Sequence, residues 1–76
     1  MILKFDPKLY DSYSKHDPWF VGYKTEDNDF VVIESHMSEI GSVKAVVILN
    51  NHELNNNREA KYSHIPNPNP DKRGMR

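Results

Sequence analysis

The sequence predicts a small α+β fold: an antiparallel sheet of three to four strands, one short N-terminal helix, a frayed C-terminal helix and a disordered tail rich in Pro and Asn. Three observations predict it. The chain has 76 residues, which suffice for one domain with a single core. Aromatic and β-branched residues occur in short runs separated by turn-forming residues, which is typical of strands. From residue 50 onward, Asn and Pro largely replace apolar residues, so this part contributes little to a core.

The N-terminal elements are expected to be a strand and a helix. Residues 1–5 contain Ile, Leu and Phe and form the expected first strand. Asp6 is suited to cap a helix, and Pro7 fits the first helical position, where its missing N–H has no intrahelical partner to lose. The helix is expected over residues 7–15, with one narrow apolar stripe made of Leu9, Tyr10 and Tyr13.

A β-hairpin is predicted next. Residues 19–24 and 30–35 are rich in aromatic and β-branched residues, and the turn-forming residues 25–29 lie between them. On the second run, apolar residues occupy both faces of the strand. Because a helix over 7–15 is too small to cover more than one side of a sheet, the second side needs another cover.

Residues 36–50 fit two interpretations. As a helix, they would place three apolar residues on one face: Ile40, Val43 and Val47. As a strand, residues 43–49 would expose apolar side chains on both faces, with Val46 and Ile48 opposite the rest. Four of these seven residues are β-branched, which favours the strand. Its free face would be covered by the chain's own residues 51–62, by a second copy or by another protein.

The chain is therefore divided into a compact α+β domain over residues 1–50, a marginal helix over 51–63 and a disordered or extended basic tail over 64–76. Charge follows this division. Residues 1–40 contain four Lys and eight Asp or Glu, a net charge of −4, whereas residues 41–76 contain six Lys or Arg and three acids, a net charge of +3. An acidic body with a basic tail is expected.

Several kinds of chemistry lack the residues they need. The chain has no Cys, which excludes disulfides, thiol nucleophiles and zinc–thiolate sites. The four His residues do not have the spacing of a metal site, and the isolated Gly residues form no phosphate-binding loop. We expect no catalytic residue, no metal and no cofactor. No apolar run is long enough to span a membrane or to resemble a signal peptide, so a soluble, cytoplasmic protein is expected.

The leading functional hypothesis is a non-enzymatic protein–protein interaction module, for example a phage or bacterial accessory protein that inhibits or regulates a macromolecular partner. A homodimer through a 43–49 strand is a second way to cover the sheet. The predicted interaction patch combines acidic residues with the free face of that strand: Asp17, Glu26, Asp27, Asp29, Val46 and Ile48.

Two alternatives remain open, and both use the basic C-terminal part. A nucleic-acid-associated protein would contact phosphates and bases with the following residues: Arg58, Lys61, Tyr62, Lys72, Arg73 and Arg76. A small toxin-like ribonuclease would instead use Arg58 and Lys61 to stabilise charge, and Tyr62 and His64 to transfer protons.

Overall fold

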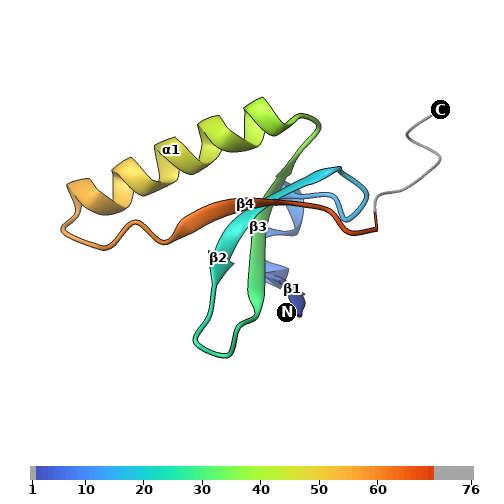
Figure 1. Cartoon of the computed structure of the whole chain (residues 1–76), viewed down its shortest axis with the longest axis horizontal. Helices are drawn as coiled ribbons and strands as arrows, with labels where there is room; N and C mark the ends of the chain where they lie inside the picture. Colours follow the sequence, from blue (N-terminus) through green and yellow to red (C-terminus); the bar gives the residue numbers. More distant parts are fainter. Residues whose placement is uncertain (1, 70–76) are drawn as a thin grey trace.

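The computed structural model describes residues 2–69, which form a four-stranded sheet with one long helix packed on it (Figure 1). The elements follow in the order β1 (Leu3–Phe5), the 3-10 helix η1 (Pro7–Ser12), β2 (Trp19–Lys24), β3 (Phe30–His36), α1 (Glu39–Asn55) and β4 (Tyr62–Pro66). The α+β prediction is confirmed. Across residues 2–69, no helix combines the length and the apolar character that crossing a membrane requires.

The predicted hairpin forms the centre of the sheet. β2 and β3 pair antiparallel, β4 pairs antiparallel with the other side of β2, and the strand order is β1-β3-β2-β4. The sheet is mixed, because β1 runs parallel to β3 on the remaining edge. The β2–β3 register shifts between Val21 and Gly22, and a Cβ at Gly22 would overlap the carbonyl oxygen of Val31. Glycine is therefore needed where the two backbones approach each other.

One cluster makes up the core on the β1–η1 side of the sheet. Phe20, Phe30 and Val32 are its buried members, and four partly buried residues pack against them: Leu3, Phe5, Tyr13 and Ile65. The rings of Phe5 and Phe20 meet edge to face with centroids 5.5 Å apart. An arrangement of this kind adds to the energy of burial alone.

The N-terminal helix begins as predicted and ends early. The Oδ1 of Asp6 accepts a hydrogen bond from the backbone N–H of Lys8 at 2.9 Å, and Pro7 follows at the first helical position. η1 is a 3-10 helix that ends at Ser12 rather than at residue 15. It ends there because Tyr13 takes an extended backbone conformation, which brings its ring to 5.3 Å from Phe5 and its hydroxyl within hydrogen-bond distance of the Asp6 carbonyl.

The predicted strand over residues 43–49 is wrong, because these residues lie within α1. Ser38 caps this helix by accepting a hydrogen bond from the Gly41 N–H at 3.1 Å. Residues at helical spacing then face the sheet, with Ser42 and Glu53 buried and residues 45, 46 and 49 half-buried. The second side of the sheet needs cover, and that tertiary requirement outweighs the weak strand preference of the β-branched residues.

The predicted helix over residues 51–63 is also corrected. Residues 51–55 are the last turn of α1, and β4 begins at Tyr62. Residues 64–66 of the expected tail are extended as part of β4, whereas residues 70–76 lie outside the described part of the chain.

Two asparagines hold β4 in place. The side chain of Asn50 donates to the Tyr62 carbonyl at 3.1 Å and accepts from the Tyr62 N–H at 2.9 Å. The side chain of Asn67 donates to the carbonyl oxygens of Lys15 and Asp17 at 2.9 and 2.8 Å. The Asn-rich composition that predicts disorder here supplies structural hydrogen bonds.

Candidate functional site

The outward side of α1 carries an apolar stripe that the fold leaves in solvent. We define the outer stripe as Ile40, Val43, Val47 and Leu54, whose exposed fractions are 69%, 40%, 51% and 56%. Their spacings of three, four and seven residues place them along one side of the helix. In Figure 1, α1 forms one outer layer of the molecule, with the strands on its other side.

Charge is scarce on this helix. Over its 17 residues, α1 contains only Glu39, Lys44 and Glu53 as Lys, Arg, Asp or Glu. Glu53 is buried, so two of these charges remain at the surface. A helix with one solvated side normally carries charged and polar residues there, and contiguous exposed apolar residues are typical of interaction sites. The exposed positions of α1 also include Asn51, His52 and Asn55, so the outer stripe is an apolar row on a helix whose remaining surface is polar but carries few charges.

The inner side of α1 combines the buried polar residues Ser42 and Glu53 with half-buried apolar residues at positions 45, 46 and 49. Ser42 is fully buried, and its hydroxyl donates to the Glu39 carbonyl at 2.6 Å. A small residue at this position lets the helix approach the sheet closely. The helical interpretation of the sequence correctly grouped Ile40, Val43 and Val47, but these residues face away from the sheet. Their spacing therefore indicated that they share one side of a helix, but it did not indicate whether that side faces the sheet or the solvent.

Glu53 is the centre of a polar latch between the end of α1 and β4. Its carboxylate accepts hydrogen bonds from the Arg58 guanidinium and, at 3.3 Å, from the Tyr62 hydroxyl. The hydrogen bond from Arg58 is the largest cause that lowers the pKa of Glu53 below its ordinary value. Burial, followed by the nearby Glu53 charge, raises the pKa of Tyr62. The latch stabilises the turn that returns the chain to the sheet.

Within residues 2–69, the basic residues that the sequence offered for nucleic-acid contact or RNA cleavage have partners within the chain. The charge of Arg58 is compensated by Glu53, and the Nζ of Lys61 lies 4.6 Å from the centre of the Tyr23 ring. His64 lies 3.6 Å from the carboxylate of Glu39. Of the remaining predicted contacts, Lys72, Arg73 and Arg76 lie outside the described residues.

The structure does not bring the predicted acidic patch together. Glu26 and Asp27 are exposed at the tip of the β2–β3 hairpin, but Asp29 is buried and pairs with Lys4 at 2.9 Å. Asp17 lies beyond the opposite end of β2, which is six residues long. At about 3.3 Å per residue, roughly 20 Å of strand separates Asp17 from the tip. The two apolar members of the patch also differ in exposure: Val46 is half-buried, whereas Ile48 is 68% exposed.

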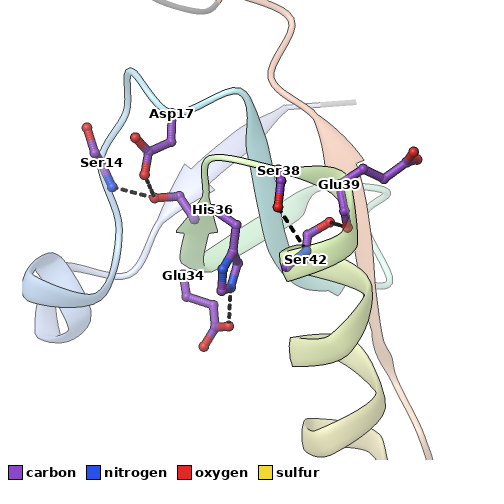
Figure 2. Close-up of polar contacts among 9 residues, drawn as sticks. Ser14, Asp17, Glu34, His36, Ser38, Glu39 and Ser42 are labelled. Carbon is purple, nitrogen blue, oxygen red and sulfur yellow. Dashed lines mark hydrogen bonds and ion pairs between the residues drawn. The ribbon is translucent and has the colours of Figure 1, made fainter.

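Polar residues gather where β3 leads into α1 (Figure 2). The Ser35 hydroxyl donates to Asp17 at 2.6 Å and accepts from the Ser14 N–H at 2.7 Å. His36 bonds instead to Glu34 at 2.7 Å. A serine nucleophile needs a histidine within hydrogen-bond reach, whereas here each side chain bonds to a different carboxylate. The arrangement fixes the start of α1 and its neighbouring loop.

Metal ligands do not gather in the part of the chain that the structure describes: no three His, Asp or Glu side chains converge there. In comparisons with known proteins, no family model, curated protein or solved structure matches this chain. The outer stripe of α1 is a row of apolar side chains that the fold of a single chain leaves 40–69% exposed.

Proposed function

We propose that this protein is a non-enzymatic protein–protein interaction module that binds through the outer stripe of α1. The observation that carries the proposal is the exposure of four apolar side chains on one side of a helix that has two surface charges. Fully burying an aliphatic side chain of this size stabilises by about 1.5–3 kcal/mol, so a partner would gain from covering each member. A module of this kind acts by occupying a partner's surface, as an inhibitor or a regulator does.

The small core supports the same proposal. Among residues 2–69, the buried hydrophobic residues are Phe20, Val21, Phe30 and Val32. A core in a chain of this size supplies only about 3–5 kcal/mol of stability. Because a partner that binds the folded state also stabilises it, association through α1 would add to this small reserve.

The pairing of the basic residues also favours protein binding over the two alternatives. An RNA-cleaving site needs uncompensated cations beside a ready proton donor. Here Arg58 is neutralised by Glu53, and the raised pKa of Tyr62 makes it a poorer acid. The exposed acidic residues Glu26 and Asp27 are available for a secondary contact with a basic surface.

The test is site-specific photocrosslinking of the full chain in the cells that produce it. A photoreactive residue replaces Val47 in one sample and the exposed Asp11 of η1 in the control sample. We expect a covalent adduct with a protein from position 47 and none from position 11. Adding Leu54→Lys to the photoreactive chain itself must weaken that adduct, because the charge would disrupt the outer stripe whatever protein covers it.

Two results would contradict the proposal. One is the absence of a protein adduct from position 47, or equal adducts from both positions. The other is turnover of RNA by the purified chain, or nucleic-acid binding that weakens steeply with salt, which would favour the alternatives.

A further inference from the structure

We propose that the partner of the outer stripe is a second copy of this chain, paired through α1 in an antiparallel dimer whose two-fold axis passes beside Val47. This inference rests on the proposed function and names its partner. It depends on three properties of α1: the symmetry of its apolar pattern, the placement of its charges and its length.

Three of the four members of the outer stripe are placed symmetrically about its centre, whereas the fourth, Val43, lies level with Asn51 of the other copy. Ile40 and Leu54 are the two ends of the outer stripe, and each lies seven residues from Val47. When two copies of the helix run antiparallel about an axis at Val47, Ile40 of each copy lies level with Leu54 of the other. Val47 then lies level with itself. A surface that meets its own copy in this way is what a two-fold interface requires.

Charge also favours the antiparallel pairing of two copies. Lys44 is the charged residue nearest the middle of the outer stripe. In a parallel pair the two Lys44 side chains would lie at the same level, where like charges repel. In the antiparallel pair Lys44 lies level with Asn50, and Glu39 lies level with Asn55, so no like charges meet. The two helix dipoles also oppose each other, which is the favourable arrangement.

The length of α1 suffices for a small interface. A helix of 17 residues is about 25 Å long and about 10 Å wide. Two such sides have a flat footprint of roughly 500 Å², and their accessible surface, which follows the side chains, is about twice that, on the order of 1,000 Å² in total, the lower limit for a specific interface. An interface at this limit forms a weak dimer, so we expect the oligomeric state to depend on protein concentration. The described strands lie on the other side of α1 and leave its outward side open to a second copy (Figure 1).

The first measurement is sedimentation equilibrium of the full chain over a series of concentrations, repeated for Val47→Glu and Ile48→Glu. Both variants place Glu on an exposed β-branched position of the same helix, but position 48 lies outside the outer stripe. We expect Val47→Glu to raise the dissociation constant at least 100-fold, because two carboxylates would meet at the axis. Ile48→Glu should change it less than threefold.

Engineered cysteines test the geometry without a destabilising charge. The chain has no Cys of its own, so each introduced thiol reports a single position. Under mild oxidation, Val47→Cys should form a disulfide-linked dimer faster than Ile48→Cys. In an equimolar mixture of the Ile40→Cys and Leu54→Cys variants, the heterodimer should form a much larger share of the linked dimers than random pairing gives, because only antiparallel helices bring these two positions level.

A monomer at every concentration, a dimer that Val47→Glu does not weaken, or a predominance of 40–40 and 54–54 disulfides would overturn the dimer. If the chain is monomeric but position 47 still crosslinks to a different protein, only the dimer fails and the interaction module stands. If position 47 crosslinks to no protein at all, both proposals fail.

Discussion

The clearest test of the described packing is one chemical change made in two environments. Val32 on β3 is fully buried in the core, whereas Val47 on α1 is 51% exposed. Replacing either residue by Ala removes the same two methyl groups. We expect Val32→Ala to destabilise the monomer strongly and Val47→Ala to leave its stability almost unchanged.

The magnitude at Val32 follows from its burial. Each buried methylene-sized group contributes about 0.8 kcal/mol by transfer, and the cavity left behind adds to the loss. Two such groups with their cavity cost about 2–3 kcal/mol. A core of this size supplies only about 3–5 kcal/mol, so Val32→Ala should remove roughly half of the free energy of unfolding.

In the control variant Val47→Ala, two small effects of opposite sign act on the free energy of unfolding. Truncation loses the partial contacts of a side chain that is already half in solvent. Alanine, however, has a helix propensity that is up to about 0.7 kcal/mol more favourable than that of valine. The net change in the free energy of unfolding of the monomer should therefore lie within about 0.5 kcal/mol of zero.

Urea denaturation followed by the fluorescence of the single Trp19 measures both values. The experiment is run at the lowest workable protein concentration, so that self-association does not contribute. A loss below about 1 kcal/mol for Val32→Ala would refute the assigned core. An equal loss for the two variants would show that α1 buries its outer stripe within one chain, which would remove the basis of both proposals.

Three further predictions concern the sheet, the helix cap and the polar latch. Gly22→Ala should destabilise by about 2 kcal/mol or more in urea denaturation, because the new Cβ would overlap the Val31 carbonyl oxygen. Ser38→Ala should cost about 1 kcal/mol and reduce helical circular dichroism, since it removes the cap of α1. Arg58 holds the pKa of Glu53 below its ordinary value of 4.5, so the folded state binds this proton less readily than the unfolded state. The resulting stability is complete above that value and is lost as the pH falls through the lower folded-state pKa. Denaturation midpoints across acid pH should therefore fall less steeply for Glu53→Gln than for the unchanged chain.

Local signals in the sequence predicted the elements that depend on local chemistry. The Asp6–Pro7 pair begins η1, and the turn-forming residues 25–29 join β2 to β3, as expected. β4 has no comparable local signal, because Ser63 and His64 interrupt its apolar pattern. It is held in the sheet by backbone pairing with β2 and by the distant side chain of Asn50. Contacts of that range cannot be inferred from the composition of the segment itself.

At the candidate site, too, the local signal was visible in the sequence and the long-range contacts were not. The spacing of Ile40, Val43 and Val47 was visible in the sequence, but the β-branched composition of residues 43–49 favoured a strand. The sequence indicated that the second side of the sheet needs cover, but its composition did not show that residues 39–55 supply that cover as a helix. The predicted acidic patch failed to assemble for a related reason, since Asp17 and Asp29 are recruited to Ser35 and Lys4 by the pairing of the strands.

The residue types on the outer stripe are themselves an argument for association. Val and Ile are weaker helix formers than Ala, by up to about 0.7 kcal/mol each, and three of the four members are β-branched. On a surface that stayed in solvent, these residues would destabilise the helix without burying apolar area in return. Against a partner they would recover that loss by burial. Val47→Ala should therefore leave the monomer unchanged or slightly more stable while weakening the dimer severalfold, and the two effects can be separated by measuring unfolding and sedimentation on the same variant. If Val47→Ala changed neither the stability of the monomer nor the affinity of the dimer, the outer stripe would contribute to no interface.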